Sequence, residues 1–337
     1  MHMGRIKPTL ILGAALIVGL TFWVSAQMDP TGTSMSTAAS RFLTALEPGQ
    51  KAQVSFAYDS PERLNWHFIP RERKGLPIKA MTPEQRALAF GMISSGTSRS
   101  GAIKATTIMS LEAILRDLEK GSGPIRDPEL YFFSIFGDPS VKGKWGWRVE
   151  GHHLSLNFTL NDGKIVAATP AFFGANPAEV RQGPREGLRT LAEVEDAALR
   201  LFQALDPAQQ KTALVNDMAP ADIPSNNGNA AGLATDPPQG EAQGVATAGF
   251  NDLQQRLFDE LVQAYAGDMP VDVARSWLYD VARSQNVRFA WYGAADRSQP
   301  HAYAVRGSNF EIEFNNTQTG ANHIHSVWRS IENDFGS

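Results

Sequence analysis

Cysteine is absent from this chain of 337 residues. Its absence excludes disulfides, thiolate metal sites, iron–sulfur clusters and cysteine nucleophiles. A bound metal would therefore need His, Asp, Glu, carbonyl or water ligands, and the chain has only seven histidines. The net charge of −4 argues against nucleic acid as the main partner. The sequence also lacks a P-loop, a dinucleotide fingerprint, an H-E-x-x-H helix and a G-x-S-x-G elbow.

The N-terminus has the pattern of a secretory signal. Arg5 and Lys7 precede an uncharged apolar run, 10–24, which is followed by the small residues Ser25 and Ala26. The run of about 15 residues is short for a membrane span, which needs roughly 20. We therefore predict that residues 1–26 are a cleaved signal peptide and that the mature chain is periplasmic or extracellular, with no membrane attachment after cleavage. An uncleaved anchor is the alternative.

Helix starts carry a repeated signature. Glu47, Thr82 and Asp206 are each followed by Pro and, two residues later, by Gln. A polar cap, Pro at the first helical position and Gln at the third are typical of a helix N-terminus. Apolar residues at spacings of three and four predict further helices over 188–205 and 253–266.

Strand-like stretches occur in two sets, 130–136, 145–150, 152–160 and 164–169, then 287–292, 301–306, 309–315 and 321–328. Three landmark pairs share one offset of 156 positions, namely Gly137 with Gly293, Gly151 with Gly307, and Phe158 with Phe314. We predict an α+β fold of two pseudo-symmetric repeats, each with helices followed by a four-stranded antiparallel meander. The repeats, about 82–174 and 206–330, would pack as one domain over 27–337. A Gly- and Pro-rich insert at 217–249 is a surface loop or a lid.

Four histidines fall in two short motifs, Gly151-His152-His153 and His323-Ile324-His325. In a strand His323 and His325 point to the same face, so both can bind one ion. A third imidazole from a neighbouring strand would complete a three-histidine site. We predict a divalent metal, zinc, iron or copper, bound by His152, His323 and His325. His153 is the second choice for the third ligand, and simple polar residues at a strand edge are the alternative.

The duplication favours one composite site, because each copy carries half of the histidine set. Glu150 would share a face with His152 in a regular strand, so it is our candidate general base. His153 is the other candidate for proton transfer. Arg148 could hold an anionic substrate or form a salt bridge. His67 could supply a fourth ligand or pack in the core.

At these motifs the sequence resembles an uncharacterised family of bacterial and fungal proteins, domain of unknown function thirty-five hundred. The similar segments are 66–76, the helix start at Thr82, the run 147–157 that ends in His152-His153-Leu154-Ser155-Leu156-Asn157, and the run 322–329 around His323 and His325. The resemblance covers nearly all of the mature chain. It implies membership of the family and no particular activity.

Three functions remain open on the sequence alone. The first is a metal-dependent enzyme, hydrolytic or oxidative, that acts on a small molecule or a peptide. The second is a non-catalytic extracytoplasmic protein that captures a metal or a small molecule. The third is a structural module whose histidines are incidental. An open coordination position distinguishes the first from the second, and imidazoles too far apart to share an ion would favour the third.

Overall fold

The computed structural model describes residues 31–225 and 240–336, so the predicted signal peptide and part of the 217–249 insert lie outside it. The first half contains α1 (Thr31–Thr44), α2 (Pro48–Val54), β1 (Ser55–Phe56), η1 (Pro61–Leu64), β2 (Leu76–Pro77), η2 (Ile78–Ala80), α3 (Pro83–Gly96), α4 (Arg99–Leu118), β3 (Phe132–Phe136), β4 (Lys144–Gly151), β5 (Leu154–Asn161), β6 (Lys164–Ala167) and β7 (Ala171–Ala175). The second half contains α5 (Ala192–Ala204), α6 (Pro207–Ala213), β8 (Leu214–Asn216), β9 (Val245–Ala246), η3 (Thr247–Gly249), α7 (Asp252–Ala266), α8 (Val271–Arg283), β10 (Arg288–Gly293), β11 (His301–Arg306), β12 (Phe310–Asn316), α9 (Gln318–Ala321), β13 (Ile324–Ser330) and η4 (Asp334–Gly336).

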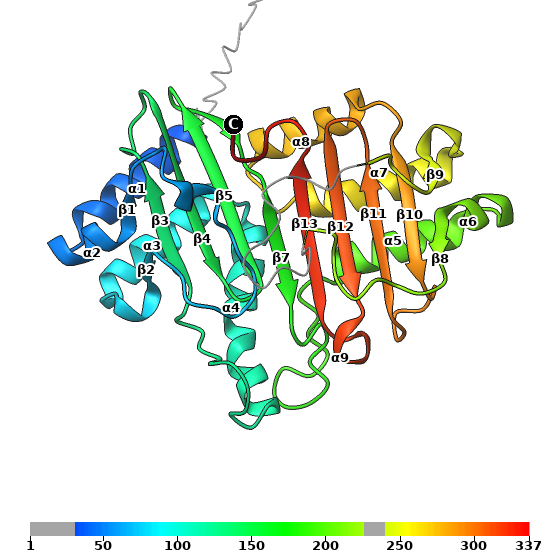
Figure 1. The fold of residues 1–337 in the computed structure, drawn as a ribbon, viewed down its shortest axis with the longest axis horizontal. Helices are drawn as coiled ribbons and strands as arrows, with labels where there is room; N and C mark the ends of the chain where they lie inside the picture. Colours follow the sequence, from blue (N-terminus) through cyan, green and yellow to red (C-terminus); the bar gives the residue numbers. More distant parts are fainter. Residues whose placement is uncertain (1–30, 226–239, 337) are drawn as a thin grey trace, which may run out of the picture.

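The strands form one large mixed sheet, in the order β1-β3-β4-β5-β7-β13-β12-β11-β10-β8 (Figure 1). The pairs β1/β3 and β8/β10 are parallel, and the other pairs are antiparallel. The predicted α+β class is therefore confirmed. None of the helices in the described part of the chain combines the length and the apolarity that a membrane crossing requires.

One strand differs from the sequence prediction. We expected 164–169 to be the last strand of the first set, but β6 covers only part of it and pairs with β5 alone. The following strand, β7, pairs with β5 on one side and with β13 on the other. The two strand sets are consequently joined edge to edge through β7 and β13 (Figure 1).

The predicted helix starts are confirmed at Glu47, Thr82 and Asp206, each with Pro at the first helical position. At each one the cap residue's backbone N–H donates to the side chain of the Gln three residues on. The glutamines of α2 and α3, Gln50 and Gln85, also exchange two amide hydrogen bonds. The caps of α2 and α3 therefore tie these two helices together as well as starting them.

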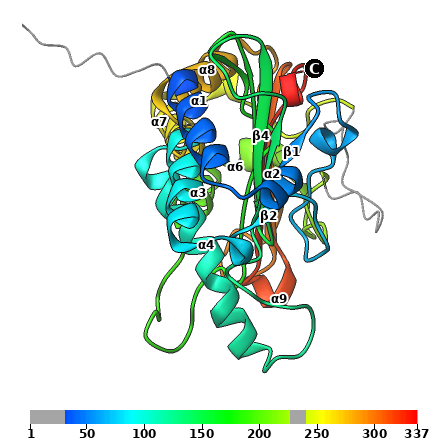
Figure 2. The same cartoon turned by 90° about the vertical axis from the view of Figure 1, so that its left-hand side faces the viewer.

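Helices cover one face of the sheet and loops cover the other (Figure 2). The main apolar core lies between the helices and the sheet, and it includes Phe173 and Trp328. A second apolar cluster packs the loops against the opposite face of the sheet. It consists of Trp66, Phe68, Phe172, Ile223, Val327 and Phe335. Since side chains alternate along a strand, Gly174 and His325 face the loop side, together with Phe172 and Val327. The centre of the sheet thus presents these residues beneath the loops.

Candidate metal centre

Three imidazole nitrogens converge where β5, β7 and β13 meet. The Nε2 atoms of His153 and His323 are 2.8 Å apart, those of His323 and His325 are 3.1 Å apart, and those of His325 and His153 are 3.2 Å apart. Nitrogens that share one ion at roughly 2.05 Å are separated by about 2.9 Å at right angles and about 3.3 Å at tetrahedral angles. The observed distances lie within about 0.1 Å of this range, so the three histidines could hold one metal ion.

The size of this triangle of nitrogens also fits a single ion. A circle through the three Nε2 atoms has a radius of about 1.8 Å, by geometry from their separations and slightly less than a typical metal–imidazole bond of about 2.05 Å. Because this radius is no larger than such a bond, His153, His323 and His325 could all hold the same ion. In the described part of the chain this set supplies three ligand atoms.

Gly174 makes the convergence sterically feasible. It pairs with His325 in the β7–β13 register, and its N–H donates to the His153 carbonyl at 2.8 Å. A Cβ atom at this position would lie 2.9 Å from Cδ2 of His153 and 2.9 Å from the Ile324 carbonyl oxygen. The missing side chain thus leaves the space that the His153 ring occupies, between strands that would otherwise crowd it.

Outer contacts orient the rings. Asp222 Oδ1 lies 2.6 Å from Nδ1 of His325, and the Asn176 amide lies 3.4 Å from Nδ1 of His323. A carboxylate on the far nitrogen fixes the tautomer that leaves Nε2 free for a metal. Phe68 packs against the His325 ring, with ring centres 4.8 Å apart. These contacts hold the set in place before any metal arrives.

The site is largely buried. His153 and His325 are 2% and 5% exposed, and His323 is half-buried. Burial and the neighbouring imidazole of His152 keep the pKa of His153 well below 6.5, and burial with His325 lowers the pKa of His323 to about 3. Neutral imidazoles have the lone pair that a metal needs.

His152 takes a different place from the one expected. His153, the second choice, supplies the third nitrogen beside His323 and His325, and these three histidines are called the trio below. His152 instead turns to Glu112 of α4, with its Nδ1 2.5 Å from the carboxyl oxygen. The expectation assumed a strand from residue 152, but β5 begins at Leu154 and His153 has a left-handed φ of 64°. Strand alternation therefore does not apply at these two positions.

Glu112 and His152 form a second buried pair beside the trio. Glu112 is 3% exposed, and burial raises its pKa to about 8. Burial and the charge of Arg126 hold the pKa of His152 well below 6.5. Glu112, His152 and His153 all have ligand atoms within 4.8 Å of one another. His153 therefore belongs to both buried groups.

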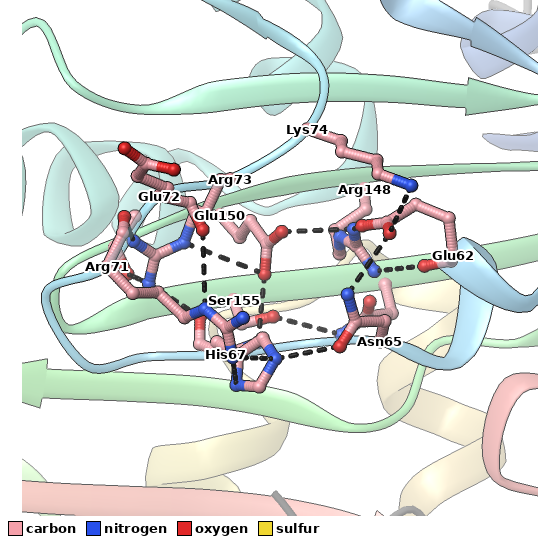
Figure 3. Close-up of polar contacts among 12 residues, drawn as sticks. Glu62, Asn65, His67, Arg71, Glu72, Arg73, Lys74, Arg148, Glu150 and Ser155 are labelled. Carbon is pink, nitrogen blue, oxygen red and sulfur yellow. Dashed lines mark hydrogen bonds and ion pairs between the residues drawn. The ribbon is translucent and has the colours of Figure 1, made fainter. Parts of the chain in front are cut away.

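Glu150 and Arg148, our candidate catalytic residues, lie in a separate buried network (Figure 3). Arg148 bonds Glu62 at 2.8 Å and Glu150 at 3.0 Å. Glu150 also accepts the backbone N–H of His67 at 2.9 Å. The His67 ring contacts Asn65 and Arg71 rather than the trio. These contacts engage both residues in tying the 62–73 loop to β4.

Sequence reasoning missed Glu112, Gly174 and Asp222. Glu112 had a readable signal, because it occupies the apolar stripe of α4 with Ile108 and Leu115, where a carboxylate is out of place. Asp222 stands in the Gly- and Pro-rich insert, where no periodicity marks it. Gly174 follows an apolar run and looks like any strand glycine.

The fold and the histidines together describe an α+β protein with a candidate metal site. The chain belongs to the DUF3500 family, described as a protein of unknown function, whose profile matches residues 29–337. The resemblance seen in the sequence is therefore confirmed. No curated protein and no solved structure matches the chain.

Proposed function

We propose that this chain is a metal-dependent enzyme whose ion is bound by His153, His323 and His325. The observation that carries the proposal is the convergence of three Nε2 atoms within 2.8–3.2 Å. The Asp222 contact on the far side of His325 adds the outer support that metal-binding imidazoles usually have.

The donor set favours catalysis over a purely structural metal. Structural zinc sites are closed by four protein ligands, whereas catalytic ones use three and keep a position for water or substrate. Zinc, iron and copper all accept three imidazoles. A bound zinc would lower the pKa of its water to about 7 and so support hydrolysis, whereas iron or copper would support oxidation. We take the substrate to be a small molecule or a peptide.

A second candidate is supported by the depth of the site. With two of the three imidazoles almost fully buried, the chain could capture a metal ion and release it slowly, without turnover. The two candidates differ in one property. An enzyme must let an added ligand reach the ion, whereas a storage site has no such need.

Two further proposals concern the whole chain. The first is an internal duplication. Apart from the short 3-10 turns, β6 and α9, the order α2, β1, β2, α3, α4, β3, β4, β5, β7 recurs as α6, β8, β9, α7, α8, β10, β11, β12, β13. The reciprocal amide pair of Gln50 and Gln85 also recurs, as Gln209 and Gln254.

The second proposal is export, which rests on the basic and apolar pattern of residues 1–26. N-terminal sequencing of the exported protein should begin at Gln27, and a full-length membrane form would contradict it.

Cobalt substitution tests the proposed enzyme site. Wild type should bind one cobalt ion per chain with visible absorption bands of a low-coordinate nitrogen site. Azide should shift these bands if a coordination position is open. His323→Gln should abolish the spectrum. Bands that azide leaves unchanged would favour metal capture, and no binding of cobalt, zinc, iron or copper would refute both candidates.

A further inference from the structure

A pocket of about 280 Å³ lies along the 62–74 loop, in the polar network of Figure 3. Its wall is built from charged and polar side chains, namely three cations, three acids, an amide and an imidazole. None of the trio lines it. Its volume is near the low end of ligand pockets, which begin at roughly 300 Å³. The pocket is therefore a site for a small polar ligand, separate from the metal centre.

Two cations balance the two acids at the buried end of the pocket. Arg148 bonds Glu62 at 2.8 Å and Glu150 at 3.0 Å, and Nε of Arg73 lies 3.9 Å from Glu150. The Arg73 guanidinium also donates to three backbone carbonyls around it. This end of the pocket is consequently fixed and has no net charge.

The rim of the pocket has one positive charge in excess. Arg71, Lys74 and Glu72 are all exposed there. Lys74 lies 3.9 Å from Glu62, which Arg148 already neutralises. Among the residues that the structure describes, no carboxylate oxygen lies within 4.0 Å of the Arg71 guanidinium. The wall and Arg148 together thus place four cations against three acids.

Residues 71–73 also border a neighbouring cavity, whose acids are Glu112 and Asp127. Asp127 is paired with Lys79 at 2.7 Å, and Glu112 contacts His152 at 2.5 Å. Neither acid is within ion-pair distance of Arg71. The excess positive charge of the rim therefore remains.

Arg71 is held over an imidazole that satisfies it poorly. Its Nη1 lies 2.6 Å from Nε2 and 3.2 Å from Nδ1 of His67. Burial and the charge of Arg71 lower the pKa of His67 to about 3, so the ring is neutral and has one lone pair. The Asn65 amide donates to Glu62, which turns its oxygen toward Nε2 at 2.8 Å and leaves the lone pair on Nδ1. The nearer contact of Arg71 is then donor against donor.

We propose that this pocket binds a small monocarboxylate through the guanidinium of Arg71, with Lys74 beside it. A planar guanidinium matches the two oxygens of a carboxylate, which would give Arg71 the acceptors that His67 cannot supply. One negative charge neutralises the excess of the site, whereas a dianion would be repelled by the acids of the same wall. The proposal does not depend on the proposed metal-dependent function.

Acetate and acetamide test the proposal, because they have nearly the same shape and differ in charge. Each is titrated into the protein at pH 7 and fixed ionic strength, with binding followed by NMR. We expect acetate to bind at least about tenfold more tightly than acetamide, and Arg71→Gln to weaken acetate binding at least about tenfold. Arg71→Lys should weaken it less, since the charge remains and the planar fork is lost. Lys74→Gln, at the exposed rim, should weaken it about twofold.

Arg275→Gln is the matched control, because Arg275 is exposed on α8, lies outside the pocket wall and changes the net charge equally. It should leave acetate binding unchanged. If Arg71→Gln and Arg275→Gln weaken binding equally, the effect is one of net charge and the proposal is wrong. Absent acetate binding, equal binding of acetamide, or phosphate that binds tenfold more tightly than acetate would also overturn it.

A second pair of proteins separates the pocket from the metal centre, since acetate can also bind a metal ion. Wild type and His323→Gln are both treated with zinc and titrated with acetate. We expect the same affinity in both. Acetate binding that is lost in His323→Gln and kept in Arg71→Gln would place the anion on the trio, and would overturn the pocket proposal while supporting the open metal site.

Discussion

Gly174→Ala places a single methyl group between two strands of the metal centre. In the structure a Cβ atom there would lie 2.9 Å from Cδ2 of His153 and 2.9 Å from the Ile324 carbonyl oxygen. Both separations are shorter than Cβ atoms tolerate, and ordinary contact begins near 3.4 Å. The backbone carbonyl is held in the β7–β13 ladder, so the His153 ring is the freer of the two neighbours.

The size of the effect follows from these distances. The ring must retreat by about 0.5 Å to restore ordinary contact, whereas metal–ligand distances tolerate only about 0.2 Å. We therefore expect zinc affinity to fall by at least about tenfold, or about 1.4 kcal/mol. The overpacked strand should also lower the free energy of unfolding of the metal-free protein by about 1–3 kcal/mol.

The assay is zinc competition against a chromophoric chelator, with urea unfolding of the metal-free protein alongside. Gly91→Ala is the matched control, since Gly91 lies within α3 and an added Cβ there meets nothing within 4 Å. That variant should keep its zinc affinity and gain about 0.5–1 kcal/mol of stability. Wild-type zinc affinity in Gly174→Ala would refute the steric reasoning, and with it the placement of the His153 ring.

Three other perturbations have defined outcomes. Asp222→Asn should weaken zinc binding about 10–100-fold in the same competition assay, because it removes the carboxylate from Nδ1 of His325. Unchanged affinity would show that the Asp222 contact does not support metal binding. Gln85→Leu and Gln254→Leu should each lower the free energy of unfolding in urea by about 1–3 kcal/mol, since each leaves a glutamine amide and a backbone carbonyl without a hydrogen-bond partner. If one variant is neutral, the two glutamines do not have equivalent roles. Burial and Glu313 raise the pKa of Glu311 from 4.5 to about 8. Because this pKa is raised in the folded state, Glu311 contributes fully to the free energy of unfolding below pH 4.5, and this contribution is lost as pH rises toward 8. Glu311→Gln should therefore flatten the fall of the free energy of unfolding with pH, by up to about 1.4 kcal/mol per pH unit. An identical pH profile would contradict it.

Much of the fold could be predicted because its signals are local. The Pro and Gln pattern at Glu47, Thr82 and Asp206 specifies helix starts through neighbouring atoms, and the structure has helices at all three. The strand 301–306 was predicted at its observed bounds. The pairing of β7 with β13 could not be predicted, because it joins segments about 150 positions apart and no short pattern records such a contact.

The candidate site shows the same division. The HxH spacing predicted that His323 and His325 lie together, and their Nε2 atoms are 3.1 Å apart, although β13 begins only at Ile324. The choice between His152 and His153 depended instead on one backbone angle, the positive φ of His153, which moves it out of the strand pattern. Asp222 reaches His325 from a loop more than 100 positions away. Such contacts are set by tertiary packing, which the local sequence does not reveal.

The adjacent pair His152 and His153 offers the most direct test of the metal centre. The two residues are neighbours and both are buried. Only His153 points its Nε2 at the other two histidines of the trio, His323 and His325. The measurement is zinc content per chain, by mass spectrometry, for His152→Gln and His153→Gln proteins that were exposed to the same metal. The account predicts one zinc in His152→Gln, as in wild type, and none in His153→Gln. Zinc retained by His153→Gln but lost from His152→Gln would contradict it.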